Sequence, residues 1–569
     1  MLDEIMPDYH YAFIGGWEVT LKAVGIFDKV FDGIYLEPEE HRMLKDLAAR
    51  GPVILLSGHR SHVDYILLSW VFGHDSDLMV PYIAAGKNLS FWPLGWWFRG
   101  SGAFFIRRSL GSDDLYREVL AAYIRRIVSD GHHVEIFMEG TRSRSGKVLP
   151  PKLGLFSMVL DAVDRLPVTA EVNFLPVAIN YERVIEEQSY SLEQSGRDKR
   201  SENIRGLYET QDVLESRFGR IYVRFGKPFS IQEMRRDMPS LRDHDCVRRL
   251  AYRIFYEMDR SFHITPTGLA ATVLLCGPHS GVGEEDFFRD AVFYLKFAVS
   301  TGKKVSHVLR PCLELGEGDI GNEANPAWKE MREVMYHAIH LLANDDLIMM
   351  SAGGGGVYHV PEHARVRLDY YKNAFYGTMG PHALACRSFL AFGREAVDLD
   401  ELKVTAKFLS KLLKYEFIFN PYLSFDANYA ATLSMLETMG LIEIDGARKI
   451  ITVLRRREVE KIGVLVESLL ESYYITAQAV ASHSGRGMSE REIVRRAFGL
   501  HERLMLERRI SRAESRNKSA VGYCIKALED RGVLVERKKK AYDVGEAYRQ
   551  REKIEALAGD VYRFIRLPP

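Results

Sequence analysis

Short apolar runs alternate with longer stretches of mixed character between residues 51 and 230, and this alternation restricts the fold more than any other feature of the chain. The apolar runs, which we predict to be strands, are 53–57, 103–106, 133–138, 174–180 and 221–226. A helix is predicted at 115–128, where Leu115, Val119 and Ile124 belong to one apolar stripe at helical spacing. Such alternation is typical of an α/β domain in which helices flank a mostly parallel sheet.

The length of the chain indicates more than one domain, because 569 residues are too many for a single hydrophobic core. We predict a helical N-terminal region at 1–45 and the α/β domain at 46–260. A mainly helical middle region is predicted at 261–400, and a mainly helical C-terminal domain at 401–569.

A histidine and an aspartate follow the first predicted strand. His59 and Asp64 are five residues apart, and on a helix they would point about 140° away from each other. A turn from the strand at 53–57 into an apolar helix beginning near Tyr65 would instead place Asp64 beside the imidazole ring. A carboxylate on one ring nitrogen fixes the tautomer, and the other nitrogen can then take a proton from an attacking hydroxyl. In a second interpretation, Ser61 and Asp64 form a Ser-x-x-Asp helix start and Asp64 only caps the helix.

Three further segments place polar residues at the end of a predicted strand, at 102–108, 137–146 and 175–181. Ligands of parallel α/β sheets bind at this edge. The second segment carries Arg142 and Arg144 among small residues, and the planar guanidinium group matches the geometry of a phosphate. We therefore expect a phosphate site there, with Glu139 holding one arginine in place. Arg107 and Arg108 form a second basic pair. Their spacing does not show which of the two would face the substrate.

Several other kinds of active site are excluded by their missing motifs. The chain has no Gly-x-Ser-x-Gly elbow and no His-Glu-x-x-His zinc motif. Gly140 and Gly146-Lys147 are one residue too far apart for a P-loop. The glycine run at 353–356 lacks the strand and the spacing of a dinucleotide fingerprint. We predict direct transfer without a metal, a cofactor or a covalent intermediate.

Composition bears on partners and on cellular location. The formal net charge is zero, which gives no argument for nucleic acid, although residues 489–543 have the pattern of a winged helix. The five cysteines form no C-x-x-C pair, and the acidic N-terminus is unlike a secretory signal. No apolar run reaches the length of a membrane span; the nearest candidates are 269–277 and the cluster at 91–98. Three of the six tryptophans lie in that cluster, which fits either contact with lipid or acyl chains or the wall of an apolar core.

Taken in this order and at this spacing, the four segments resemble the glycerolipid acyltransferases with the His-x4-Asp motif. The likeness is greatest to the membrane-bound glycerol-3-phosphate acyltransferases and the related dihydroxyacetone-phosphate acyltransferases. It extends to the residues at 84–93, 151–154, 222–228 and 369–373. Thr141 stands where many long bacterial members have glycine, and in this detail the loop is more similar to the dihydroxyacetone-phosphate enzymes.

The resemblance implies transfer of a fatty acyl group from acyl-CoA or acyl-carrier protein to the 1-hydroxyl of glycerol 3-phosphate, giving lysophosphatidic acid. Dihydroxyacetone phosphate is the alternative acceptor. The resemblance makes His59 the base and Asp64 its partner, and it places further residues at the substrate: Arg107, Glu139, Gly140, Arg142, Ser143, Arg144 and Pro176. It also implies a peripheral protein on the cytoplasmic face of the cell membrane. Two other classes remain open, a catalytically silent lipid-binding adaptor and a DNA-binding protein.

Overall fold

A computed structural model describes residues 2–7, 30–75, 78–87, 99–100, 102–107, 113–197, 216–344, 346–351, 356–374, 376–483, 487–538 and 540–565. The glycine run at 353–356 and the tryptophan cluster at 91–98 fall wholly or mostly outside these ranges, as does Arg108. The chain forms two compact units. The first comprises Met1–Ser143, Val148–Ile185 and Glu202–His263; the second comprises Arg144–Lys147, Glu186–Ser201 and Ile264–Pro569.

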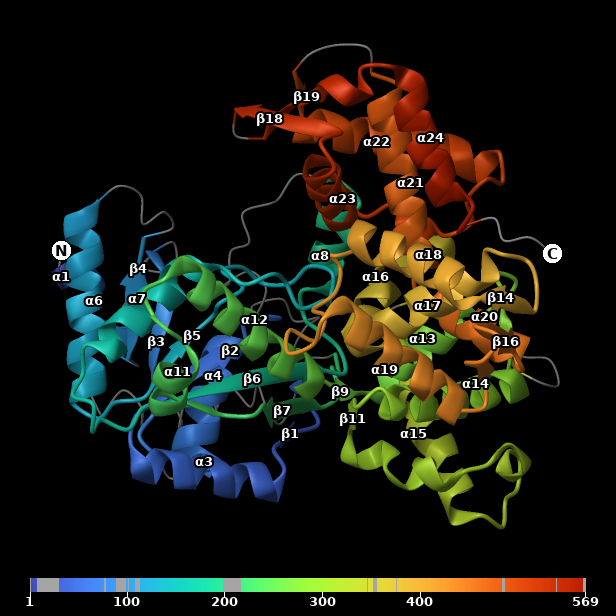
Figure 1. Cartoon of the computed structure of the whole chain (residues 1–569). Helices are drawn as coiled ribbons and strands as arrows, with labels where there is room; N and C mark the ends of the chain where they lie inside the picture. Colours follow the sequence, from blue (N-terminus) through green and yellow to red (C-terminus); the bar gives the residue numbers. More distant parts are fainter. Residues whose placement is uncertain are drawn as a thin grey trace. The chain divides into compact units, whose positions relative to one another are not determined.

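A mostly parallel sheet forms the centre of the first unit, with the strand order β1-β7-β6-β2-β5-β3-β4. Its strands are β1 (Ile34–Tyr35), β2 (Val53–Ser57), β3 (Tyr82–Gly86), β4 (Ala103–Ile106), β5 (Val134–Ile136), β6 (Asn173–Tyr181) and β7 (Ile221–Phe225), and β8 (Phe229–Ser230) pairs with β6. From β6 to β4 all neighbours are parallel, whereas β7 and β8 run antiparallel to β6. Figure 1 shows this sheet flanked by helices. The predicted α/β fold and all five predicted strands are confirmed, and β1, β3 and β8 are additional strands.

The helices of this unit lie in the connections between strands, as parallel connections require, or follow the last strand of this sheet, β8. They are α3 (Pro38–Arg50), α4 (Asp64–Trp70), α6 (Asp114–Ser129), α7 (Leu153–Asp164), α11 (Ile231–Asp237) and α12 (His244–Ser261), and α1 (Leu2–Ile5) packs on β4. The helix predicted at 115–128 is α6. It begins beside Asp113, whose carboxylate accepts from the backbone N–H of Tyr116 and so satisfies a donor of the first turn.

Pro176 lies in the middle of β6, where a proline would normally interrupt the pairing. The N–H and C=O of one strand residue point to the same side, and the carbonyl of Pro176 accepts from the backbone N–H of Gly226 at 2.8 Å. Gly226 directly follows β7, so Pro176 lies opposite a residue beyond the end of that strand. The missing N–H of Pro176 therefore faces a position where the pairing with β7 has already stopped. On the other side the register with β2 continues, with Pro176 opposite Leu56.

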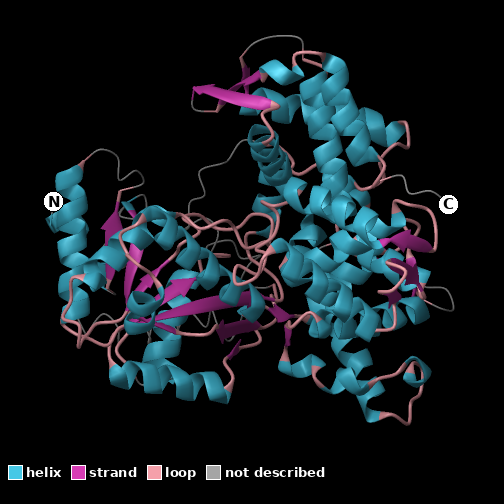
Figure 2. Cartoon of the chain, viewed as in Figure 1, coloured by secondary structure: helices cyan, strands magenta, loops and turns pink. Residues whose placement is uncertain are grey.

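The second unit is mostly helical, as Figure 2 shows by colour. Its helices are α8 (Glu187–Gln194), α13 (Pro266–Cys276), α14 (Glu284–Ser300), α15 (Pro326–Ala343), α16 (Glu362–Asn373), α17 (Gly380–Leu390), α18 (Leu399–Leu412), α19 (Phe425–Thr438), α20 (Arg456–Val464), α21 (Glu467–Ala481), α22 (Glu490–Leu506), α23 (Lys518–Asp530) and α24 (Arg551–Tyr562). Three antiparallel sheets of three strands each accompany them. The first contains β10 (Val282–Gly283), β13 (Val357–His359) and β12 (Met349–Met350), and the second contains β14 (Ala396–Asp398), β16 (Ile450–Val453) and β15 (Ile442–Asp445). The third contains β17 (Met488–Ser489), β19 (Ala541–Val544) and β18 (Leu534–Lys538).

Helix α13 forms the core of this unit. Every residue from Pro266 to Leu275 is buried, and the helix packs against α14, α15 and α16. A helix that is apolar on all sides is typical of such a position. The apolar run at 269–277 is therefore a short core helix. Within the described residues, none of the helices has both the length and the apolar character that crossing a bilayer requires.

Candidate active site

The turn between β2 and α4 brings His59 and Asp64 together. The backbone N–H of Gly58 still donates to Val177 of β6, at 2.9 Å, so His59 is the first residue beyond the sheet edge. Helix α4 begins at Asp64, and the imidazole Nδ1 lies 2.9 Å from the Asp64 Oδ2. Both side chains are buried, with exposed fractions of 4% and 0%. The geometry predicted from the strand-to-helix turn is therefore present.

Asp64 accepts hydrogen bonds from several donors at once. Its Oδ2 accepts from the backbone N–H groups of Arg60 at 2.6 Å and Ser61 at 2.9 Å, and its Oδ1 accepts from the Tyr181 hydroxyl at 2.5 Å. The bond from Ser61 is the one expected of a Ser-x-x-Asp helix start. The two interpretations of Asp64 are therefore compatible, because the same carboxylate oxygen holds the turn and contacts the imidazole.

These contacts fix the proton positions on His59. Backbone N–H groups can only donate to Asp64, so Oδ2 is an acceptor and the imidazole proton resides on Nδ1, which leaves a lone pair on Nε2. Burial lowers the pKa of His59 from 6.5 to about 4; Asp64 opposes this effect, while the charges of Arg142 and His62 add to it. At neutral pH the ring is neutral and able to accept a proton.

Glu139 holds an arginine that comes from the turn after β2. The Nη1 of Arg60 lies 2.9 Å from Oε1 and 3.0 Å from Oε2 of Glu139, and both side chains are buried. The Arg60 guanidinium also lies over the ring of Phe262, 4.7 Å from its centroid. Burial raises the pKa of Glu139, and the contact with Arg60 opposes that rise. This pair ties the turn after β2 to the loop after β5.

The loop after β5 packs directly against the histidine turn. The backbone N–H of Ser143 donates to the carbonyl of His59 at 2.8 Å, and Ser143 is fully buried. Gly140 has a φ of +67°, and a Cβ there would lie 3.0 Å from the Lys152 side chain, so glycine suits the turn. Arg142 is 7% exposed and its charge acts on His59. The first unit thus brings together His59, Asp64, Glu139, Arg142 and Ser143.

The remaining predicted residues have other surroundings. Arg144 belongs to the second unit, where its Nε lies 3.4 Å from Glu193 and its guanidinium lies over the ring of Tyr190. Arg107 binds Glu4 and Asp113, each at 2.8 Å, and Arg107 together with Lys87 lowers the pKa of Glu4 to about 2. Pro176 lies on β6, beside the strand that leads into the histidine turn.

Sequence reasoning missed several groups around the imidazole. The Tyr65 hydroxyl lies 3.0 Å from the His59 Nε2, and the ring of Phe137 lies 4.4 Å from the imidazole centroid. Tyr181 bonds to Asp64 from the end of β6, and Glu135 is fully buried in β5. Only Tyr65 could have been found from the sequence, because it directly follows Asp64. The others reach the site through strand pairing, which a single sequence does not reveal.

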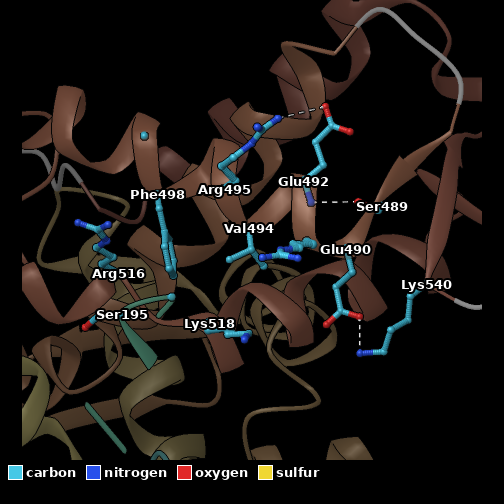
Figure 3. A pocket seen from close by; sticks show the side chains of 13 residues that line it. Ser195, Ser489, Glu490, Glu492, Val494, Arg495, Phe498, Arg516, Lys518 and Lys540 are labelled. Carbon is cyan, nitrogen blue, oxygen red and sulfur yellow. Dashed lines mark hydrogen bonds and ion pairs between the residues drawn. The ribbon is translucent and has the colours of Figure 1, made fainter. Parts of the chain in front are cut away.

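A separate groove lies in the second unit, in the region predicted to be a winged helix. Its volume is about 1020 Å³, and Figure 3 shows Phe498, Arg495, Lys518 and Lys540 among its lining residues. None of the candidate site residues is among the described residues that line it. The elements α21, β17, α22, α23, β18 and β19 follow one another as in a winged helix.

The third helix of that region, α23, is engaged within its own unit. Ser519 at its start exchanges hydrogen bonds with Gln194 of α8. Asp530 at its end binds Lys414 and Tyr415. In helix-turn-helix proteins that bind DNA, the corresponding helix enters the major groove. These contacts favour a structural role over nucleic-acid binding.

Comparisons with known proteins agree with the resemblance seen in the sequence. A family model described as the glycerol-3-phosphate acyltransferase C-terminal region matches residues 190–537, and a second, described as acyltransferase, matches residues 40–180. The glycerol-3-phosphate acyltransferase of Ectopseudomonas mendocina is 28% identical over 94% of this chain and 63% of its own length. That of Alteromonas mediterranea is 31% identical over 62% of this chain and 46% of its own length.

The chain spans about three fifths of the length of the curated relatives that match along most of it. Among solved structures, the 1-acyl-sn-glycerophosphate acyltransferase of Thermotoga maritima matches with a TM-score of 0.26 at 17% identity, covering 43% of this chain and 77% of that one. The α/β fold of this chain is therefore established by its own strand order and strand pairing. The first family model covers more than half of the chain. The chain belongs to the glycerol-3-phosphate acyltransferase family.

Proposed function

We propose that the protein is a glycerol-3-phosphate 1-O-acyltransferase, which transfers a fatty acyl group from acyl-CoA or acyl-carrier protein to the sn-1 hydroxyl and so forms lysophosphatidic acid for phospholipid synthesis. The observation that carries the proposal is the buried, neutral imidazole of His59, oriented by Asp64 and flanked by Arg142. The names of the relatives and the family match support the choice of acceptor. The reaction exchanges a thioester for an ester and needs no redox cofactor.

In the proposed reaction, the Nε2 of His59 takes the proton of the acceptor hydroxyl as its oxygen attacks the thioester carbonyl. The imidazolium that forms is stabilised by the carboxylate of Asp64 on Nδ1, at 2.9 Å. When the tetrahedral intermediate collapses, the carbon–sulfur bond breaks and the thiolate takes the proton from Nε2. General-base assistance of this kind contributes roughly 10²–10⁴-fold to the rate.

We assign the acceptor phosphate to the arginines of the loop after β5, Arg142 and Arg144, with Arg107 as a further substrate contact. Gly140 and Ser143 shape the loop, since Gly140 adopts a positive φ and Ser143 is anchored to the carbonyl of His59. Glu139 acts indirectly through Arg60, which it holds against the histidine turn. Pro176 belongs to the wall of the site, next to β2. We further propose a peripheral location at the cytoplasmic face of the membrane, where the acyl product enters lipid.

The decisive experiment supplies purified protein with one long-chain acyl thioester and, separately, with glycerol 3-phosphate or dihydroxyacetone phosphate. We expect faster transfer to glycerol 3-phosphate, measured as acylated product. His59→Ala should abolish turnover while the circular dichroism spectrum remains that of the wild type. Failure with both acceptors would contradict the proposal. An adaptor role would instead leave the function of the chain intact in His59→Ala.

A further inference from the structure

A tyrosine hydroxyl lies at the nitrogen on which the proposed reaction depends. Tyr65 is the second residue of α4, directly after Asp64, and its hydroxyl lies 3.0 Å from the Nε2 of His59. The two rings meet edge to face with centroids 5.0 Å apart, and Phe137 packs against both of them. The Tyr65 side chain is half-buried, whereas His59 is almost fully buried.

The direction of this hydrogen bond follows from the other side of the ring. Nδ1 carries the imidazole proton because Asp64 accepts there, so Nε2 has a lone pair and no hydrogen. The Tyr65 hydroxyl must therefore donate to Nε2. This is the same lone pair that takes the proton of an attacking hydroxyl. In the structure, the nitrogen that would take this proton is therefore already hydrogen-bonded to the hydroxyl of Tyr65.

We propose that Tyr65 is a positioning residue that keeps Nε2 of His59 occupied until the acceptor hydroxyl replaces it, and that it thereby prevents water from being activated against the acyl thioester. The inference rests on the proposed function. The suppressed side reaction is hydrolysis, in which water attacks the thioester carbonyl, its proton passes to Nε2, and the thiol leaves with that proton.

The geometry fits such an exchange. Tyr65 lies in the first turn of α4, directly after the turn that Asp64 holds, and its ring is only half-buried. The proposed exchange requires this ring to turn away from the imidazole. A single neutral hydrogen bond is weak enough to be exchanged for one from an incoming hydroxyl. A bound acceptor is held by its phosphate as well, and water is not. The acceptor can therefore displace Tyr65 where water competes poorly.

The test compares wild type, Tyr65→Phe and Tyr123→Phe. Tyr123 is a buried tyrosine of α6 in the same unit that packs on Phe104, so its variant repeats the chemical change away from His59. Release of free thiol from a long-chain acyl-CoA is measured without acceptor, and transfer is measured over a range of glycerol 3-phosphate concentrations. Circular dichroism and thermal melting establish that each variant is folded.

In Tyr65→Phe we expect acceptor-free hydrolysis to rise by roughly 2- to 12-fold, the range that corresponds to one neutral hydrogen bond. The KM for glycerol 3-phosphate should fall, with kcat changed little, because the acceptor no longer displaces a hydroxyl. Tyr123→Phe should match the wild type in both measurements.

Unchanged hydrolysis and unchanged KM in Tyr65→Phe, with the wild type transferring normally, would overturn this inference alone. A folded Tyr65→Phe that loses transfer would also overturn it, because Tyr65 would then be needed for the reaction itself. Absence of transfer by the wild-type chain would contradict the proposed function and, with it, this inference.

Discussion

Arg60 donates from a single guanidinium nitrogen to both carboxylate oxygens of Glu139, at 2.9 and 3.0 Å, although the two residues are 79 positions apart. Arg60 adjoins the candidate base and Glu139 begins the basic loop after β5. The pair therefore connects the position of the imidazole to the position of the loop that we assign to phosphate.

Replacing Arg60 by alanine should strongly destabilise the first unit. It would leave the Glu139 carboxyl buried without its cation, and breaking a buried ion pair costs about 3–5 kcal/mol. Urea denaturation followed by circular dichroism measures the change. Arg60→Ala combined with Glu139→Ala should lose less than the sum of the single variants, since the two side chains act as a pair. Additive losses would argue against that coupling. Arg117→Ala, on the exposed face of α6, serves as a control with little expected effect.

The pH dependence of catalysis should reflect the burial of His59. Its pKa is lowered to about 4, so the ring stays neutral and able to accept a proton well below the ordinary value of 6.5. We expect kcat/KM to be retained from pH 7 to pH 5.5 and to fall as the pH drops toward 4. The acid limb of kcat/KM against pH measures this, with circular dichroism at each pH to detect unfolding. A limb centred near 6.5 would mean that the free enzyme has a more solvated imidazole.

Removal of a loop arginine should weaken the binding of the acceptor. Arg142→Ala and Arg144→Ala should each raise the KM for glycerol 3-phosphate by roughly 10- to 150-fold, the equivalent of about 1.5–3 kcal/mol for one charged hydrogen bond. The matched control is Arg126→Ala, because Arg126 is exposed on α6 and binds only Asp130 among the contacts that the structure records for it. Steady-state kinetics with the acceptor varied at saturating thioester provides the measurement. An unchanged KM in both loop variants would refute the phosphate assignment.

Glu135 should make the first unit less stable as the pH rises. Burial in β5 raises its pKa from 4.5 to about 8, an effect that the Ser57 hydroxyl opposes and the charge of Asp64 reinforces. The folded chain therefore holds a proton that the unfolded chain releases between these values. Stability from this group is present in full below pH 4.5 and is lost as the pH rises through 8.

Glu135→Gln removes that titration and keeps the shape of the side chain. Relative to wild type, its free energy of unfolding should increase with pH by up to about 1.4 kcal/mol per pH unit within this window. Urea denaturation of both chains at pH 5.5 and 7.5 gives the comparison. Parallel pH dependence of the two proteins would show that Glu135 does not titrate in this range.

The sequence was sufficient for the parts of the fold that have a local pattern. Buried strands such as β2 and β6 are continuous apolar runs, and most of the stripe of α6 is buried at helical spacing. Leu115, which the sequence assigned to that stripe, is instead 64% exposed, because it lies in the first turn of the helix. Strand β3 was not predicted because Tyr82–Gly86 contains two alanines and a glycine, so its apolar signal is weak. The antiparallel direction of β7 was not predicted either, since a strand has the same residue pattern in both directions.

At the candidate site, the sequence by itself determined the contact between His59 and Asp64, because a strand, a short turn and a helix start bring together residues only five positions apart. Tertiary structure decided what surrounds that contact: the Arg60–Glu139 pair, the Tyr181 bond to Asp64, and the burial that keeps the imidazole neutral. The physical reason is the distance along the chain over which each effect acts. Turn geometry acts over a few residues of one chain segment, whereas hydrogen bonds between strands and the loss of solvent depend on segments that only the folded sheet places side by side.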